Sequence, residues 1–220
     1  MTNNKVAKAC RITRQYLMAK DFKMIKDIVI ATGNIHKVEE IKSILKDLDI
    51  EIISMTSFSQ YPKIVEDGKT LEENAAKKAK EAAVFFKKWA IADDSGLEVD
   101  YLNGYPGVYC ARYAGEECSY DDNNKKLLDA LEGVSKERRT ANFRTVIAIS
   151  SPDGKIYLAD GKISGTITSQ AKGFNGFGYD PIFYVPELKK TFAELDCEVK
   201  NSISHRAKAL QKVKEIIRSL

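Results

Sequence analysis

The order of apolar runs along the chain restricts the fold more strongly than any other feature of this sequence. In the first half, short apolar runs alternate with segments whose apolar residues recur at helical spacing, at 28–31, 38–48, 50–53, 71–88 and 90–92. In the second half, the alternating stretches 143–149 and 156–167 flank the turn sequence SPDG, as in a β-hairpin. Strand–helix alternation followed by a hairpin favours an α/β fold with a mixed sheet.

Three helices have recognisable limits in the sequence. Thr70 stands where an N-cap is needed, with Glu73 as its capping-box partner, so we expect a long helix over 71–88. Two further helices are expected over 120–131 and 202–220. No internal repeat and no low-complexity linker interrupts this sequence, so it offers no boundary between folded domains.

Composition excludes several classes of protein. The 220 residues are 44% hydrophobic and 30% charged, which suits one packed domain with an ordinary solvated surface. The four cysteines form no C-x-x-C pair and only two histidines occur, which disfavours a zinc site and a disulfide framework. No apolar run approaches the length that spans a bilayer, and no secretory signal is recognisable. We therefore expect a cytoplasmic protein with no membrane partner.

Positive charge is concentrated near the N-terminus. Residues 1–26 contain seven lysines and arginines and a single acid, so residues 27–220 are slightly acidic although the whole chain carries a net charge of +4. A nucleic-acid partner is therefore not expected for the main body. We divide the chain into a basic extension, 1–26, and a single domain, 27–220. The extension is either a solvated segment or a contact for RNA, a membrane or a protein partner.

The segment TGNIHK, residues 32–37, joins an expected strand to an expected helix. Backbone N–H groups at a helix N-terminus favour an anion, and Lys37 can bring a positive charge to a phosphate. The segment lacks the G-x-x-x-x-G-K-[ST] pattern of a Walker A loop. From these residues alone, a phosphate site and an ordinary N-capped turn are equally good interpretations.

Two adjacent acids, Asp93 and Asp94, follow the apolar run 90–92. Aspartate is a poor strand residue and neighbouring like charges repel, so we expect the strand to break over 93–96 and a second strand to follow at 97–101. One interpretation is a Mg²⁺ site, since this ion takes one or two carboxylates together with substrate phosphates and water. In the other interpretation Asp93 turns or caps the chain and Asp94 is solvated.

The segment GFNGFGYDPIF, residues 173–183, combines four aromatic side chains with three glycines. Phe177, between two of the glycines, can present its ring to a flat base. Tyr179 and Asp180 then turn the chain before Pro181. The alternative is an aromatic turn that packs on the core.

A basic group, Lys200 with Ser204, His205 and Arg206, opens the last expected helix. Positive charge at a helix N-terminus opposes the helix dipole. A bound anion or a keto-bearing base would offset that cost. The alternative is a solvated basic turn.

Together these segments resemble the inosine triphosphate pyrophosphatase family, the noncanonical purine nucleoside triphosphate pyrophosphatases, over residues 27–220. Five motifs in register carry the resemblance: ATGNIHKVEEI, EDGKTLEENAAKKA, AIADDSGLEVDYLNGYPGVYCARYAG, GFGYDPIFYVP and KNSISHRAKAL. It implies an elongated α/β fold whose long mixed sheet is flanked by helices, with two lobes around a central nucleotide cleft. It also implies a homodimer and Mg²⁺-dependent hydrolysis of ITP, dITP and XTP to the monophosphate and pyrophosphate.

Carried over position by position, the resemblance implies roles for individual residues. Asp94 is the proton acceptor and a metal-site carboxylate, and Glu66 is a second metal contact. Independently of the resemblance, we expect hydrogen-bond donors from His205, Arg206 or backbone N–H groups to favour the 6-keto group of the purine. The substrate-binding set comprises Thr32, Gly33, Asn34, Ile35, His36, Lys37, Ser95, Phe177, Gly178, Tyr179, Asp180, Lys200, His205 and Arg206.

Two other functions stay open. One is a pyrophosphatase that acts on other modified nucleotides. The other is a nucleotide- or RNA-binding module without catalysis, which would use the basic extension. The complete set of acidic and basic motifs favours an enzyme with a purine nucleoside triphosphate as its substrate.

Overall fold

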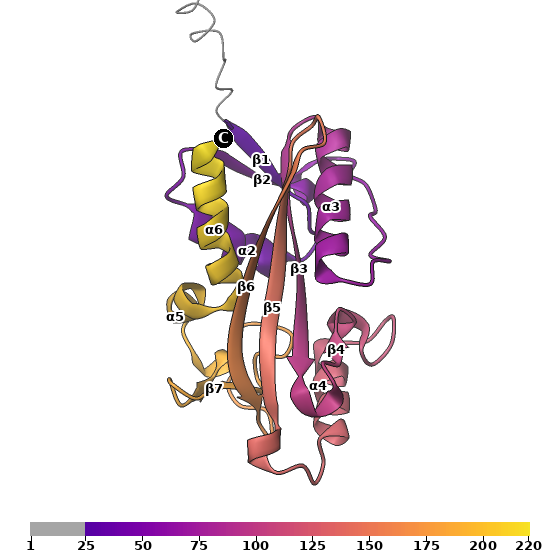
Figure 1. Ribbon diagram of the computed structural model, residues 1–220, viewed down its shortest axis with the longest axis vertical. Coiled ribbons are helices and arrows are strands. Elements are labelled where there is room, and N and C mark those ends of the chain that lie inside the picture. Colours follow the sequence, from indigo (N-terminus) through magenta and orange to yellow (C-terminus); the bar gives the residue numbers. More distant parts are fainter. Residues whose placement is uncertain (1–24) are drawn as a thin grey trace, which may run out of the picture.

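A long, twisted sheet runs the length of the molecule and carries helices on both faces (Figure 1). The computed structural model describes residues 25–220, so the predicted basic extension lies almost wholly outside the described residues. The strands are β1 (Asp27–Ile30), β2 (Glu51–Ser54), β3 (Trp89–Val99), β4 (Pro106–Gly107), β5 (Thr140–Ser150), β6 (Ile156–Ile167), β7 (Phe183–Val185) and β8 (Lys190–Thr191). The helices are α2 (Ile35–Leu45), α3 (Leu71–Phe86), α4 (Tyr120–Ala130), α5 (Cys197–Ile203) and α6 (His205–Ser219).

The sheet is mixed, as the sequence predicts. Its strand order is β2-β1-β3-β5-β6-β7-β8, with β4 beside β3. β1 pairs parallel with β2 and β3, whereas the ladders from β3 through β5 and β6 to β8 are antiparallel. The hairpin of β5 and β6 is paired along its whole length, from Thr140 opposite Thr166 to Ser150 opposite Ile156. Both the α/β class and the late hairpin are therefore confirmed.

Different helices cover the two faces of the upper sheet because side chains alternate along each strand. Ile30 and Ile91 pack in one core with α2 and α6. Ala90 and Ala92 pack in another with the alanine-rich face of α3. In Figure 1, α6 and α3 accordingly lie on opposite sides of β5 and β6. A third core joins α4 to the lower ends of β3, β5 and β6, so the sheet connects an upper and a lower lobe.

The long helix α3 begins as predicted but ends earlier. Thr70 accepts a hydrogen bond from the Glu73 N–H at 3.2 Å, which caps the first turn. The Glu73 carboxylate accepts from the Lys69 N–H rather than from Thr70, so only half of the expected capping box forms. The helix stops at Phe86 because Lys87 adopts a left-handed conformation with φ of 53°.

The C-terminal helix predicted over 202–220 is divided in the structure. α5 covers Cys197–Ile203, and α6 starts at His205 with Ser204 as its N-cap. The Ser204 side chain accepts from the Ala207 N–H at 3.1 Å, which explains why the helix restarts there.

The expected break at residues 93–96 is wrong, because β3 continues through them. Its ladder with β5 runs unbroken from Ala90 opposite Ser150 to Val99 opposite Ala141, and this pairing outweighs the poor strand propensity of aspartate. On the other edge, within residues 25–220, β1 pairs only as far as Ile91 and β4 pairs only with 97–98. The two carboxylates therefore lie where the strand is held on one edge and open on the other.

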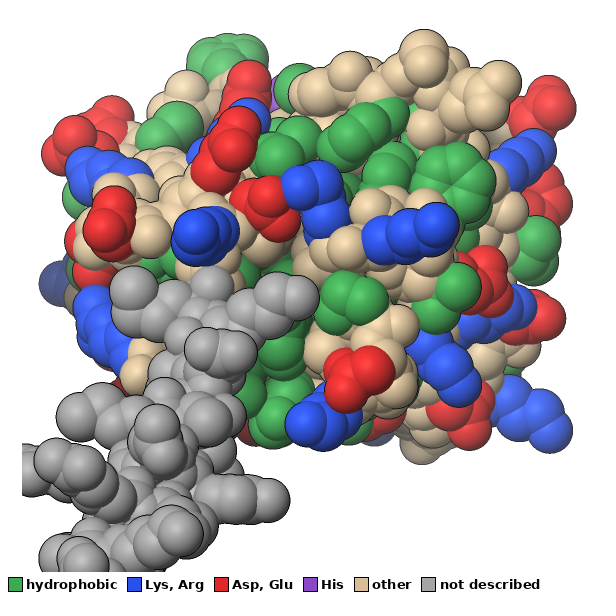
Figure 2. Space-filling view, turned by 90° about the horizontal axis from the view of Figure 1, so that it is seen from above, with side chains coloured by type: hydrophobic (Ala, Val, Ile, Leu, Met, Phe, Trp, Pro, Cys, Tyr) green, Lys and Arg blue, Asp and Glu red, His purple; other side chains and the backbone are tan. Residues whose placement is uncertain are grey.

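The end of the sheet at which β1 begins has a mixed surface. Viewed from above in Figure 2, acidic and basic side chains are interspersed with apolar ones. None of the helices between residues 25 and 220 combines the length and the hydrophobicity needed to cross a bilayer.

Candidate functional site

One cleft, with a volume of about 690 Å³, gathers most of the residues singled out from the sequence. It opens where the unpaired edge of β3 faces the β1–α2 turn, the glycine-rich loop and the start of α6. The predicted residues that line it are Thr32, Gly33, Asn34, Lys37, Glu66, Asp94, Ser95, Phe177, Gly178, Tyr179, Asp180, Lys200, His205 and Arg206.

Ile35 and His36 belong to the predicted binding set but do not line the cleft. Ile35 is the first residue of α2 and is 57% exposed. His36 is also exposed, and its ring lies against Phe177 instead. The start of α2 thus places both side chains outside the lining, with His36 beside the cleft-lining Phe177, and their contact with a ligand stays a prediction.

The β1–α2 turn is held by Asn34. The Asn34 side-chain oxygen accepts hydrogen bonds from the N–H groups of His36 and Lys37, at 3.0 and 3.4 Å. The Asn34 N–H in turn donates to the Thr32 hydroxyl at 3.2 Å. Two of the helix N–H groups expected to meet an anion are therefore already bonded to the cap. This leaves the Lys37 ammonium as the charged group that the turn presents to the cleft.

Asp93 points toward α2 and α6 and is fully buried. Arg206 donates to one of its oxygens from Nε at 3.0 Å and from Nη2 at 2.8 Å, and the Ser95 hydroxyl donates to the same oxygen at 3.0 Å. Lys37 Nζ lies 3.1 Å from the other oxygen, outside hydrogen-bond geometry. Burial alone would raise the pKa of Asp93, but Lys37 and Arg206 outweigh it and hold this pKa far below its usual value.

The ion pairs continue away from Asp93 toward the glycine-rich loop. Glu40 on α2 binds Arg206 Nη1 at 2.5 Å and Lys200 Nζ at 2.8 Å. Lys200 also binds Asp180 at 2.5 Å, and Asp180 accepts from the Phe177 N–H at 2.8 Å. The protein's own carboxylates thus offset the positive charge of Lys200 and Arg206, and the binding of a ligand at this group stays a prediction.

Asp94 points to the opposite face of the sheet, toward α3. Lys78 Nζ donates to it at 3.0 Å and to Glu66 at 2.8 Å, while Asn74 Nδ2 donates to the second Asp94 oxygen at 3.1 Å. Burial raises the pKa of Asp94 to about 6; Lys78 opposes this rise and Glu66 adds to it. At neutral pH Asp94 is thus largely ionised, yet it is a better proton acceptor than an ordinary aspartate.

Three of these contact residues lie within the motifs ATGNIHKVEEI and EDGKTLEENAAKKA but received no role from the sequence: Glu40, Asn74 and Lys78. Asn74 and Lys78 are four residues apart on the buried face of α3, in phase with Leu71 and Ala75. That helical spacing is the signal that could have identified them.

Two rings that line the cleft, those of Phe177 and His205, are held by stacking contacts. The Phe177 ring stacks on His36 with centroids 5.3 Å apart, and Lys200 Nζ lies 4.7 Å from its centroid. His205 stacks on Phe143 at 4.7 Å, and its Nδ1 has no hydrogen-bond partner in the described part of the chain. Burial, helped by Arg206 and Lys200, holds the pKa of His205 well below its usual value, so the imidazole is neutral.

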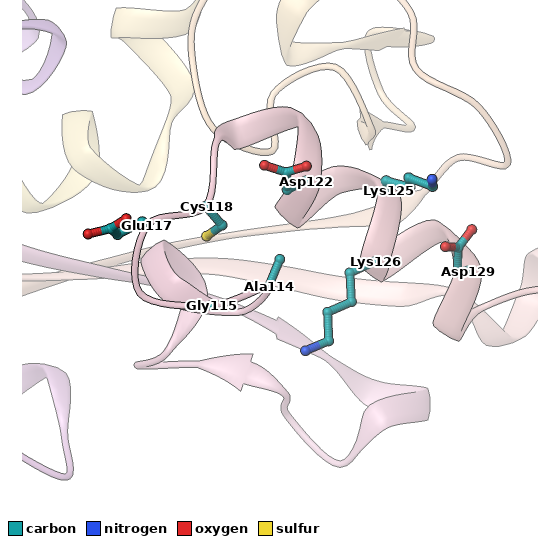
Figure 3. A pocket seen from close by; sticks show the side chains of 8 residues that line it. All are labelled: Ala114, Gly115, Glu117, Cys118, Asp122, Lys125, Lys126 and Asp129. Atoms are coloured by element: carbon teal, nitrogen blue, oxygen red, sulfur yellow. The ribbon is translucent and has the colours of Figure 1, made fainter.

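A second depression, of about 490 Å³, lies on the outer side of α4 (Figure 3). Asp122 is engaged in a capping box with Ser119, and Lys126 donates to the Tyr113 carbonyl at 2.6 Å. The charged side chains labelled in Figure 3 point in different directions and do not converge on a common point. We therefore place the functional site in the larger cleft.

The fold and the site together define an α/β protein with a nucleotide-sized cleft, built from carboxylates and cations around one strand–helix turn. The chain belongs to the Ham1 family, whose sequence model matches residues 28–216. This finding confirms the family resemblance carried by the five motifs.

Known relatives match this chain over nearly their whole length. A dITP/XTP pyrophosphatase of Desulforamulus reducens is 54% identical over 88% of this chain and 96% of its own, and one of Clostridium perfringens is 47% identical over 89% and 99%. The solved structure of a HAM1 protein from Coxiella burnetii superposes with a TM-score of 0.81, at 42% identity, covering 89% of this chain and all of that one. The two-lobed fold predicted from the resemblance is therefore that of its structural relatives.

Proposed function

We propose that this protein hydrolyses the purine nucleoside triphosphates ITP, dITP and XTP to the monophosphate and pyrophosphate. The observation that carries the proposal is Asp94, a carboxylate with its pKa raised to about 6 on a cleft wall that also includes Lys37. The names of relatives that are about half identical in sequence support the substrate class.

Cleavage of a phosphoanhydride needs an acceptor for the proton of the attacking water and positive groups beside the phosphates. Asp94 suits the first task because its raised pKa makes its carboxylate more basic. Lys37 suits the second because it lies on the β1–α2 turn at the cleft. Asp93 holds Lys37 and Arg206 in place and takes no part in proton transfer, since its pKa is far too low.

Glu66 and Asp94 would hold a Mg²⁺ ion. Both carboxylates line the cleft and share the Lys78 ammonium group, at 2.8 and 3.0 Å, so an ion held by both would take the place of this ammonium group. Among residues 25–220, no cluster of three or more His, Cys, Asp or Glu forms a metal site by itself, but Mg²⁺ commonly uses one or two carboxylates plus phosphates and water. When bound, the ion would neutralise phosphate charge and lower the pKa of water.

We assign selection of the 6-keto group to His205. Its ring is neutral and its Nδ1 has no hydrogen-bond partner within residues 25–220. This nitrogen is buried beside the cleft, so it would donate to a keto oxygen only if the bound base displaced the groups that cover it. An amino group at the same position would leave that donor unpaired. Arg206 already uses all three of its nitrogens on Asp93, Glu40 and Ser95, so we assign it support of the site rather than base recognition.

The decisive experiment measures pyrophosphate release from ITP, dITP, XTP, GTP and ATP side by side, with and without Mg²⁺. We expect Mg²⁺-dependent release that strongly prefers the first three. Preference for another modified nucleotide would replace the substrate assignment, and nucleotide binding without turnover would indicate a binding module.

Lys37→Ala is expected to weaken triphosphate binding by about tenfold or more, because a charge-assisted contact to phosphate is lost. Binding of the monophosphate should fall by much less. Calorimetric titration with a non-hydrolysable ITP analogue and with IMP measures both. Lys42→Ala, on the exposed side of the same helix, is the matched control. Equal losses for the two ligands would place Lys37 away from the β and γ phosphates.

We further propose a cytoplasmic homodimer, as the family resemblance implies. Light scattering of the purified chain tests the assembly. Deletion of residues 1–26, followed by salt-dependent RNA-binding measurements, tests whether the extension adds a nucleic-acid contact.

A further inference from the structure

A hydrogen bond joins the two sides of the cleft at its mouth. Asn34 Nδ2, on the β1–α2 turn, donates to the Tyr120 hydroxyl at 3.1 Å. Tyr120 is the first residue of α4, so the bond links the upper lobe to the lower lobe across 86 positions of sequence. Both residues line the cleft, and Tyr120 is 42% exposed. A tyrosine this exposed adds little to the core, so its contact calls for another explanation.

The position of Tyr120 is fixed from its own side of the cleft. Ser119 and Asp122 form a complete capping box around the first turn of α4. One turn further on, Asn124 Nδ2 donates to the Gly178 carbonyl at 3.0 Å, which ties α4 to the glycine-rich loop. The Tyr120 ring also lies 6.1 Å from Phe177, inclined by 45°. The hydroxyl is therefore presented by a rigid support.

Asn34 connects the Tyr120 hydroxyl to the backbone of the β1–α2 turn. Its oxygen must face the N–H groups of His36 and Lys37 to cap α2, so its NH₂ group faces the other way and needs an acceptor. The Tyr120 hydroxyl is that acceptor. The stack of His36 on Phe177 joins the start of α2 to the glycine-rich loop, which α4 holds in turn through Asn124.

We infer that Tyr120 is a positioning residue for the phosphate-binding turn: its hydroxyl fixes the Asn34 amide, and Asn34 fixes the first turn of α2 that carries Lys37. This inference rests on the proposed function, because it assigns the turn to the polyphosphate. The inferred role concerns phosphate binding alone. Loss of the Tyr120 hydroxyl should therefore leave the preference for keto over amino purines unchanged.

Tyr120→Phe removes the hydroxyl and keeps the ring. We expect the KM for ITP to rise about threefold to tenfold, the range that corresponds to one net hydrogen bond, while kcat changes less than twofold. The ratio of ITP to ATP turnover should stay constant. Tyr105→Phe is the control, since Tyr105 is 56% exposed and lies outside the cleft lining.

A double-mutant cycle tests whether the effect passes through Asn34. In an Asn34→Ala background, Tyr120→Phe should raise KM no further. A full additional increase would overturn the inference, as would an unchanged KM in the single variant. A changed ITP-to-ATP ratio would also contradict it, because Tyr120 would then act on the base.

Amide hydrogen exchange of the free protein provides a readout that needs no turnover. Tyr120→Phe should speed exchange over residues 35–38, whereas Tyr105→Phe should leave it unchanged. Faster exchange in a protein that hydrolyses none of the tested nucleotides would retain the positioning role and reject the proposed function. Unchanged exchange in an active enzyme would reject the positioning role alone.

Discussion

Asp94→Asn is expected to abolish turnover while the protein stays folded. Loss of a positioned proton acceptor typically lowers kcat by about 10²- to 10⁴-fold, and loss of a metal-site carboxylate adds to this. The asparagine oxygen still accepts from Lys78 or Asn74, which now donate to Asp94 at 3.0 and 3.1 Å. Steady-state pyrophosphate release and thermal unfolding of the same preparation measure the two effects.

Asp94→Asn should not lower the free energy of unfolding at neutral pH, although it removes a buried carboxylate. The folded-state pKa of Asp94, about 6, is above the unfolded value of about 3.9, so the carboxyl stabilises the fold at low pH and loses that contribution as the pH rises through 6. At pH 7.5, Asp94→Asn should therefore unfold no earlier than the wild type. Near-normal kcat would remove Asp94 from the mechanism. A large loss of stability would mean that its role is structural.

Asp93→Asn is expected to have the opposite profile, with a large loss of stability. Removing one partner of a buried ion pair costs about 3–5 kcal/mol in the free energy of unfolding, because the remaining charge stays buried. Here the group left behind is Arg206, which is also fully buried and binds Asp93 through two nitrogens. Urea denaturation at pH 7 measures the loss.

The exposed pair of Asp160 with Lys212, at 2.7 Å, supplies the control. Asp160→Asn should change the free energy of unfolding by less than about 1 kcal/mol, because solvent screens the pair. The folded-state pKa of Asp93 is below its unfolded value, so its stabilisation is present above pH of about 4 and is lost as the pH falls below that. The difference between wild type and Asp93→Asn should accordingly narrow in acid. A difference that is constant down to pH 2 would contradict the ion-pair explanation.

The parts of the fold that could be predicted are those specified by local pattern. α3 is marked by helical spacing and by Thr70, and the β5–β6 hairpin by alternation around SPDG. The continuity of β3 could not be predicted in the same way. Asp, Ser and Gly disfavour a strand locally, and only the pairing with β5, some fifty residues further along the chain, keeps residues 93–96 extended.

The candidate site likewise has residues that the sequence could identify and residues that it could not. The cleft-lining residues stand in motifs whose residue types suggest their chemistry. The partners that neutralise them lie in the same motifs, but there Glu40 and Lys78 look like ordinary charges on solvated helices. Only the packing of α2 and α3 on the sheet brings Glu40 to Arg206 and Lys78 to Asp94. Sequence reasoning therefore found the cations of the cleft but assigned them to a ligand, when acids of the chain already hold most of them.

Neighbouring residues of one extended strand place their side chains on opposite faces of the sheet, and β3 uses this to give its two carboxylates different hydrogen-bond partners. Substitutions of Asn74 or Glu66 would change the partners of Asp94 and leave the Asp93–Arg206 ion pair on the far face intact, although Lys37 and Lys78 act on both carboxylates. This arrangement also depends on the register of β3 in the sheet. A single inserted residue before Asp93 that kept the strand pairing would turn each acid to the opposite face of the sheet, and anchoring and reactivity would be lost together.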